Sequence, residues 1–400
     1  MTGTFVAPIG ILLLAACLIA MITRRLGLPY IVGLVIGGFL IALLPNSPEL
    51  PLSRELIFNV LLPPLVFEAA LQLNWQRFRD ELALTLTLAF LGVAIAGTIV
   101  AAGMHYWVGW SWIGAALFGA LIAATDPVSV IAAFREMRAE KRLSMVVESE
   151  SLLNDGAAAA GFAVLLAIAG GSSAGPIAST MAFLWATGGG VLTGLAISSL
   201  AILIAGRTND HLIEITLTTV VAYSSFLVAE HFHASGIIAA LTAGLTIGRF
   251  SKQVFADEEG PLVRSIWEYI AFLANSVIFI LIGMNEANQP LREFVSLAAL
   301  GAIALVLLGR AISIYPLALL FSRSRWRLPM PYQHVLFWGG LRGALALALA
   351  LAVPVSVPER SAIIVAAFLV VAFSILVQGL TMPRLLKWYD LREPEEGASR

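Results

Sequence analysis

The chain has 400 residues, of which 59% are hydrophobic and only 12% are charged, and its formal net charge is -1. Soluble domains carry about 25% charged residues, so a soluble fold could not cover this much apolar surface, and the balanced charge excludes a basic nucleic-acid-binding protein. The single cysteine, Cys17, excludes a disulfide framework and a cysteine-based metal cluster. The composition therefore predicts a protein that resides in the lipid bilayer.

Apolar runs that are long enough to cross a bilayer recur along the whole chain. A helix of about 20 apolar residues crosses the hydrocarbon layer, where only helices and closed barrels satisfy the backbone. The runs are continuous rather than alternating, which favours helices. We therefore predict an all-α polytopic membrane protein. Its thirteen expected spans cover residues 7–23, 29–44, 56–71, 82–105, 112–134, 143–169, 180–205, 212–230, 235–249, 264–284, 294–320, 332–353 and 360–383.

The basic residues predict how these spans are oriented. Lys and Arg gather in cytoplasmic connections, and alternate connections of this chain differ strongly in their content of these residues. Arg24 and Arg25 follow the first apolar run instead of preceding it, so this run is a span and not a cleaved signal peptide. We expect a cell-membrane protein with its amino end outside and its carboxyl end in the cytoplasm. The connections expected outside hold only three basic residues, Arg54, Arg292 and Arg360.

Charged residues also lie inside the predicted spans. An ionised side chain at the centre of a membrane helix costs about 2.5–3.5 kcal/mol, so each such residue is a candidate for a functional role. At a rise of about 1.5 Å per residue, Asp155 and Arg310 lie about 20 Å from the nearest cytoplasmic charge, and Asp126 lies about 14 Å from its own. A layer of charges at this depth, drawn from several spans, indicates a binding site. The six residues are Glu68, Asp126, Glu150, Asp155, Arg310 and Arg342.

Two of the predicted spans contain helix-breaking sequences. In the fifth span Asp126 precedes Pro127, which lacks an amide proton and disfavours helix in the residue before it. Asp126 is also a suitable N-cap for a helix that restarts at Pro127. The twelfth span has three glycines within residues 339–343. Interrupted helices at matching places in two halves indicate a transporter binding site, and these two spans cross in opposite directions, as an inverted repeat requires.

The sixth span begins with a polar sequence. Ser151 and Asp155 are four residues apart and share one helix face, while Glu150 and Asn154 share the neighbouring face. The first face offers a hydroxyl and a carboxylate to a ligand, and the second can meet a basic partner. We interpret Glu148 as a solvated residue of the first helical turn, because acidic residues suit helix starts.

These residues resemble the NhaP-type sodium/proton antiporters, the bacterial relatives of the animal Na+/H+ exchangers. The matching residues extend over nearly the whole membrane part, from residue 63 to residue 343. The resemblance does not extend to the long cytoplasmic tail of the animal exchangers, so their tail-borne regulation is not carried over. The matches are Pro63-Pro64-x-x-x-Glu68, Thr125-Asp126-Pro127, Glu150-Ser151-x-x-Asn154-Asp155, Arg310 and Gly340-Leu341-Arg342-Gly343.

The resemblance implies a fold of two inverted repeats with two crossed broken helices, the fifth and twelfth spans. It implies a transmembrane antiporter domain over residues 1–389 and a short cytoplasmic tail over 390–400. Within the membrane domain, a core would comprise spans 82–169 and 294–383, and a dimerisation domain would comprise spans 7–71 and 180–284. A homodimer in the lipid bilayer and an elevator-like motion of the core against the dimerisation domain would follow.

The resemblance also implies roles for the matched residues. Asp155 and Asp126 would be the carboxylates that bind the cation and the proton, with Ser151 and Thr125 as further oxygen ligands of Na+. Glu68 would contribute from the third span, and Glu150 would form an ion pair with Arg310. Asn154 would also belong to the cation- and proton-binding residues. As a neutral residue in place of a second aspartate, it resembles the electroneutral members of the family. Pro127, Gly340, Arg342 and Gly343 would support the broken helices.

The chemistry of these residues explains how exchange could be obligatory. Na+ and Li+ are hard ions that prefer oxygen ligands, which carboxylates and freed backbone carbonyls supply. A proton and a cation neutralise the same charge and therefore exclude one another. An empty ionised site is costly to carry across the membrane, so a site that moves only when occupied gives antiport by alternating access. We expect Asp155 to carry both ions, without a cofactor or a catalytic residue.

Three alternatives stay open from the sequence. One is a K+/H+ antiporter of the same fold, and a second is a cation channel, because carboxylates line cation pores as well. The third is an intramembrane enzyme, which would need clustered acids for Mg2+, zinc ligands or a nucleophile–base pair. The sequence has no HExxH motif, and its 5 histidines lie at span ends or in loops. We therefore expect a transporter and not an enzyme.

Overall fold

The computed structural model describes residues 3–26, 28–44, 53–126, 128–171, 175–205, 210–251, 260–287 and 297–391. Every regular element in these ranges is a helix, which confirms the predicted all-α class. Four π-helical segments, η1 to η4, continue directly into α-helices or follow them. The first half of the chain forms α1 (Gly3–Leu26), α2 (Tyr30–Ala42), η1 (Leu56–Leu61), α3 (Leu62–Gln72), α4 (Trp75–Leu86), η2 (Thr87–Leu91), α5 (Gly92–Gly103), η3 (Met104–Val108), α6 (Trp112–Ala123), α7 (Val128–Met137), α8 (Lys141–Ala169) and α9 (Pro176–Ala205).

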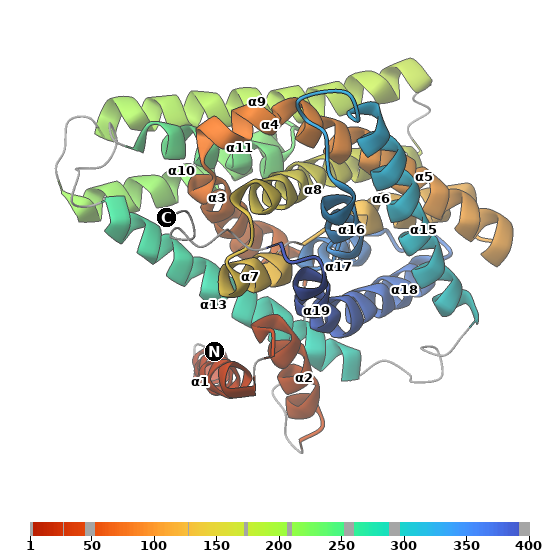
Figure 1. Ribbon diagram of the computed structural model, residues 1–400, viewed down its shortest axis with the longest axis horizontal. Helices are drawn as coiled ribbons and strands as arrows, with labels where there is room; N and C mark the ends of the chain where they lie inside the picture. The colour runs from red at the N-terminus through yellow and green to blue at the C-terminus, as the bar shows by residue number, and fades with distance from the viewer. Residues whose placement is uncertain are drawn as a thin grey trace, which may run out of the picture.

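The second half of the chain continues the same pattern of apolar helices. Figure 1 shows α9 along one edge of the molecule, with α10 and α11 beside it, and α16 to α19 gathered on the other side of α8. These helices are α10 (His211–His231), α11 (Gly236–Arg249), α13 (Gly260–Ala287), α15 (Leu297–Leu320), α16 (Met330–Trp338), α17 (Ala344–Leu351), α18 (Arg360–Phe373), η4 (Ser374–Gly379) and α19 (Leu380–Trp388).

The lengths of the described helices bear on the predicted number of spans. Seven helical stretches are long and apolar enough to cross a membrane, and shorter apolar helices occupy most of the other predicted ranges. The chain is therefore a membrane protein, whereas the number of thirteen crossings stays a prediction. The seven stretches are Trp75–Val108, Lys141–Ala169, Pro176–Ala205, Leu212–His231, Pro261–Asn285, Leu300–Leu320 and Arg360–Trp388.

The α2–α13 pair is held by close backbone contact. A Cβ atom added to Gly38 of α2 would collide with the Ile280 carbonyl group, and one added to Gly283 of α13 would collide with the Val35 carbonyl oxygen. Small residues at such crossings let two membrane helices approach closely, where packing rather than the hydrophobic effect drives association. The glycines therefore fix α2 on α13 without any charged group at the crossing points.

Helix α17 lies in the interior of the structure. Its sequence alternates alanine and leucine, and all residues from Ala344 to Ala350 are buried. A helix that is apolar all round belongs in the interior, where neighbours cover every side. The neighbours of α17 include α6 and α18. Because α17 begins directly after residue 343, its burial places the second predicted break in the core.

Candidate functional site

Two helix interruptions meet in the interior. Residues 124–126 follow the end of α6 and are not helical, and residues 339–343 separate α16 from α17. The backbone N–H of Asp126 donates a hydrogen bond of 2.7 Å to the carbonyl of Leu341. Two non-helical segments that lie far apart in the sequence are thus joined through their backbones. Pro127 lies outside the described residues, so its predicted role is not addressed by the structure.

Helix α8 holds the first interruption at Thr125. The side-chain oxygen of Asn154 accepts a hydrogen bond of 3.1 Å from the Thr125 backbone N–H, and its amide nitrogen donates one of 2.6 Å to the Thr125 hydroxyl. The Ser151 hydroxyl donates a hydrogen bond of 2.5 Å to the Thr125 carbonyl. All three residues are buried. These bonds replace the helical partners that the backbone of Thr125 lacks.

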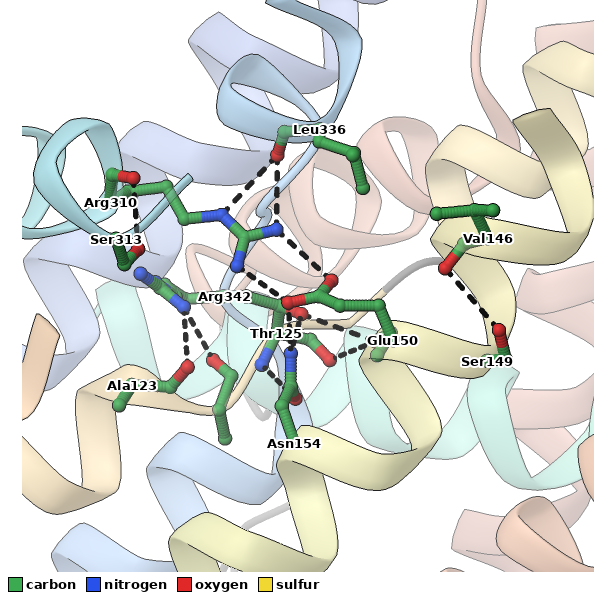
Figure 2. A network of polar contacts seen from close by, with 12 residues as sticks. Ala123, Thr125, Val146, Ser149, Glu150, Asn154, Arg310, Ser313, Leu336 and Arg342 are labelled. Carbon is green, nitrogen blue, oxygen red and sulfur yellow. Dashed lines mark hydrogen bonds and ion pairs between the residues drawn. The ribbon is translucent and has the colours of Figure 1, made fainter. Parts of the chain in front are cut away.

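An ion pair joins α8 to α15. Arg310 donates two hydrogen bonds to the Glu150 carboxylate, of 2.7 Å and 3.1 Å, in a bidentate arrangement. The same guanidinium donates to the carbonyl of Leu336 near the end of α16, at 3.0 Å and 3.3 Å (Figure 2). Arg310 is 6% exposed and Glu150 is 1% exposed. Removing one partner of such a buried pair costs about 3–5 kcal/mol, because the other charge is left uncompensated.

Two neighbours complete the surroundings of this ion pair. The Asn154 amide nitrogen also donates a hydrogen bond of 3.2 Å to Glu150 Oε1, so Asn154 links the ion pair to Thr125. At the second interruption, a Cβ atom on Gly340 would lie 2.6 Å from Arg310 Nε. A side chain at residue 340 would collide with the Arg310 guanidinium, so a glycine is needed at this position.

Arg342 lies in the second interruption and donates hydrogen bonds to the backbone next to the first one. Its Nη1 donates hydrogen bonds of 2.9 Å and 3.0 Å to the carbonyls of Ala123 and Ala124, and the residue is 2% exposed. These carbonyls belong to the end of α6, where helical acceptors are unsatisfied and a positive charge is favourable. Figure 2 shows the two arginines serving separate partners, with Arg342 directed to α6 and Arg310 to Glu150.

Asp126 lies against both helix restarts. Its Oδ1 accepts a hydrogen bond of 3.0 Å from the backbone N–H of Val128, at the start of α7. On the other side, a Cβ atom on Gly343 would collide with the Asp126 carboxylate. The close approach of Gly343 therefore brings the second interruption next to a carboxylate, at the point where α17 begins.

Two polar side chains of the site each keep a buried atom without a hydrogen-bond partner among the residues that the structure describes. These atoms are Asp155 Oδ1 and Arg342 Nε. A buried polar atom without a partner is costly, and such an atom in a native structure calls for an explanation, such as a ligand or a catalytic role. Asp155 lies on the face of α8 that carries Ser151, whose hydroxyl bonds the Thr125 carbonyl.

A cavity of about 900 Å³ reaches both aspartates. Its walls include Asp126, Asp155 and Thr125 together with Glu68 of α3, so the structure brings these four predicted site residues to one space. Glu150, Arg310 and Asn154 do not line this cavity, but the Asn154 amide bonds Thr125 of its wall. The arrangement offers carboxylate and hydroxyl oxygens on one wall, which are among the ligands that hard cations prefer.

Two further acidic residues line the cavity. Glu148 lines the cavity from the third turn of α8. The interpretation of Glu148 as a first-turn residue is therefore wrong, because the helix begins earlier, at Lys141. Glu268 lines the cavity from α13 and accepts a hydrogen bond of 3.1 Å from Gln72. Glu268 lies inside a predicted span, so the rule that selects the other intramembrane charges would find it as well.

The comparison with known families identifies the chain. A family described as "Sodium/hydrogen exchanger, transmembrane" matches residues 11–388. The chain belongs to the sodium/hydrogen exchanger family. It is a family of transporters, and the resemblance drawn from the sequence motifs is thereby confirmed.

Relatives within the exchanger family are similar over most of their length. The chain is 38% identical to the low-affinity Na+/H+ antiporter NhaS1 of Synechocystis sp. over 371 residues, which cover 91% of this chain and 70% of that protein. It is also 38% identical to the Na+/H+ antiporter ApNhaP of Aphanothece halophytica, over 90% of this chain and 69% of the relative.

A solved structure shares the fold. The sodium proton antiporter MjNhaP1 from Methanocaldococcus jannaschii, determined at pH 8, matches with a TM-score of 0.76 at 20% sequence identity. The match covers 96% of this chain and 98% of that chain. This exchanger therefore has the NhaP fold, and its helices follow the same course over almost the whole chain.

Proposed function

We propose that this exchanger carries out Na+/H+ antiport and that Asp155 binds the cation and the proton in turn. The observation that carries the proposal is the buried Asp155 Oδ1, which has no hydrogen-bond partner among the described residues and belongs to a residue that lines a cavity shared with Asp126. The names of relatives that are 38% identical support the choice of Na+ as the cation. Li+ is a second candidate cation because it prefers the same oxygen ligands.

The contacts of the site support separate roles for its residues. Asp155, Asp126 and Thr125 would supply oxygen ligands from the cavity wall, with Ser151 adding a hydroxyl and Glu68 contributing from α3. Asn154 would act as a positioning residue, because its amide already bonds Thr125 and Glu150. Arg310, Arg342 and Gly340 would hold the interruptions in shape.

Competition for one charge would couple the two ions. A proton or a cation on Asp155 neutralises the site, whereas an empty ionised carboxylate is costly to move through a low-dielectric layer. A site that changes its accessibility only when occupied then exchanges one ion for the other by alternating access. With Asn154 next to Asp155, a single carboxylate would change its occupant, which supports electroneutral one-for-one exchange.

The proposal extends to the architecture that the resemblance implies. The exchanger would have thirteen spans with the amino end outside the cell membrane, inverted repeats whose broken helices cross at residues 124–127 and 339–343, and a homodimeric assembly. The core, over spans 82–169 and 294–383, would move against the dimerisation spans 7–71 and 180–284. The direct contact between the two interruptions and the glycine-packed α2–α13 pair support this division.

Reconstituted vesicles provide the test. The purified exchanger is placed in vesicles with a pH-sensitive dye, and Na+, Li+ or K+ is added across a pH series. We expect Na+-dependent proton movement in the wild type and none in Asp155→Asn, which keeps the size of the side chain but cannot hold the charge. Asp80→Asn is the matched control, since Asp80 is exposed on α4 and away from the cavity.

The outcomes of this assay separate the proposal from its alternatives. Retained exchange in folded Asp155→Asn would refute the assignment of this residue. Exchange with K+ and none with Na+ would identify a K+/H+ antiporter instead. Cation flux that needs no counter-moving proton would identify a channel.

A further inference from the structure

A second cavity lies on another side of α8. It has a volume of about 280 Å³, and its walls come from η2 and α5, from α6, from α8 and from α9. Ala157 of this cavity is two residues after Asp155, so it projects from a nearly opposite face of α8 at about 3.6 residues per turn. The cavity is thus separate from the site that holds the aspartates, although α8 contributes to both.

The lining of this second cavity is apolar. Among the described residues, no charged side chain lines this cavity, and Thr98 is the only lining residue with a hydroxyl group. That hydroxyl already donates a hydrogen bond of 2.7 Å to the carbonyl of Ala94. Cavities lined by apolar groups stay free of water, and voids of this size are rare in a well-packed interior. Hydrocarbon is therefore the favoured content of the space.

The cavity opens to the outer surface of the helices. Ala94 and Thr98 on α5 are exposed, whereas Ala158 at the opposite wall is buried. Phe90 and Phe183 meet at the rim in an edge-to-face contact with ring centroids 6.2 Å apart. The cavity is consequently a groove between α5 and α9, closed at its floor and open at one side.

The surroundings of the opening are apolar as well. On α9 near Phe183, Met181 is 63% exposed and Leu184 is 57% exposed, and both α9 and the α4–α5 stretch are long apolar helices of membrane-spanning character. Exposed apolar side chains on a membrane helix lie against lipid tails wherever the partner of the proposed homodimer does not cover them. A helix of another protein, which is about 10–12 Å wide with its side chains, does not fit a groove of this volume.

We infer that this groove between α5, α6, α8 and α9 binds the acyl chain of a membrane lipid. The occupant follows from three observations together: an apolar floor, an opening onto the lipid-facing surface and a volume suited to one flexible chain. A bound chain packs between α9 and α8, the helix that carries Asp155. The inference does not depend on which ion the exchanger moves.

Gly161 provides a way to fill the groove without disturbing the fold. A Cβ atom added to Gly161 would meet no atom within 4 Å, and the residue lines the groove from α8. The series Gly161→Ala, Gly161→Val and Gly161→Leu therefore occupies the groove progressively. Gly188→Leu is the matched control, because Gly188 on α9 also has no atom within 4 Å of an added Cβ but is outside the groove.

The experiment uses a photoactivatable lipid as the probe. The exchanger is reconstituted in phosphatidylcholine vesicles that contain a phosphatidylcholine with a diazirine in its acyl chain, irradiated and digested, and cross-linked peptides are quantified by mass spectrometry. We expect cross-links on groove residues of α5, α6 and α8. Gly161→Leu should reduce them about tenfold, because lost burial of about two methylene groups changes binding by roughly that factor. Gly188→Leu should leave them unchanged.

Three results would overturn the inference. The first is a Gly161→Leu variant that melts at the wild-type temperature and whose groove peptides are cross-linked as strongly as those of the wild type. The second is cross-linking confined to the outward faces of α5 and α9. The third is a disulfide between two copies of Ala94→Cys in a Cys17→Ser background, which would show that a second copy covers the opening.

Discussion

The apolar crossing of α2 and α13 and the polar contact between the two helix interruptions are built in opposite ways. At the first, glycines let backbones touch, and the colliding atoms around Gly38 and Gly283 are backbone atoms of the partner helix. At the second, side chains supply most of the contacts, through the Glu150–Arg310 pair and the hydrogen bonds of Asn154 and Arg342. The first arrangement needs only close packing, whereas the second requires every partner to be present.

The comparison shows that this exchanger buries these charged groups next to the helix interruptions and not at the crossing of the intact helices α2 and α13. Packing through small residues stabilises a helix pair without desolvating any charge. Breaking a helix inside the membrane frees backbone groups that must find new partners. In this exchanger those partners are Arg342, Asn154 and Ser151. The polar region is therefore sensitive to the loss of single groups, and the apolar region is sensitive to added volume.

The largest effect is expected from Arg310→Ala beside the polar contact between the two interruptions. It leaves Glu150 buried without its bidentate partner and removes the donors to the Leu336 carbonyl. We expect the free energy of unfolding to fall by about 3–5 kcal/mol. Thermal melting in detergent measures the loss. Arg323→Ala, which removes an exposed arginine, is the control, and a wild-type melting profile for Arg310→Ala would contradict the role of the pair.

The next effect is expected from Gly283→Val at the apolar crossing. The new side chain collides with the backbone of Val35 on α2, which cannot move without displacing the whole helix. Overpacking of this kind costs about 1–3 kcal/mol. Melting temperature and folded yield measure it, with Gly301→Val as the control, because an added Cβ at Gly301 meets no atom within 4 Å. Equal stability of the two variants would show that α2 and α13 are not tightly packed.

A smaller effect is expected from Glu268→Gln, which changes a charge of the cavity but keeps an acceptor for Gln72. Negative charge along a cavity raises the local cation concentration. We expect the Na+ concentration for half-maximal exchange to rise severalfold at low salt, with an unchanged maximal rate. Glu55→Gln, at an exposed residue outside the cavity, is the control. An unchanged half-maximal concentration would separate Glu268 from the path of the cation.

No effect at all is expected from the membrane potential. One-for-one exchange at a site with the neutral Asn154 beside Asp155 moves no net charge, whereas each net charge moved would contribute about 2.3 kcal/mol per 100 mV. The exchange rate is measured in vesicles with an imposed potassium diffusion potential and again with the potential collapsed. Net exchange driven by voltage would show that the proposal of electroneutral transport is wrong.

The sequence predicts the residues of the polar contact better than those of the apolar crossing. Charges and helix breakers inside apolar runs stand out along the chain, and they single out Asp126, Asp155 and Arg310. Gly38 and Gly283 give no comparable signal, because glycine is common in membrane helices. Only the position of the facing helix shows that a larger residue would collide there. The prediction for Glu148 is wrong because the start of a helix is less certain than its existence.

The sequence by itself determined the membrane location, the all-α class, the family and six of the intramembrane charges. It could do so because the cost of placing a charge or a proline in an apolar helix is local and is read residue by residue. Only the tertiary structure decided that Asn154 links Thr125 to Glu150, that Glu268 shares a cavity with the aspartates, and that two phenylalanines border a second groove. These facts depend on contacts between helices that lie far apart in the chain. A cavity is the space that the side chains of several helices leave unfilled, so no single segment of the sequence predicts it.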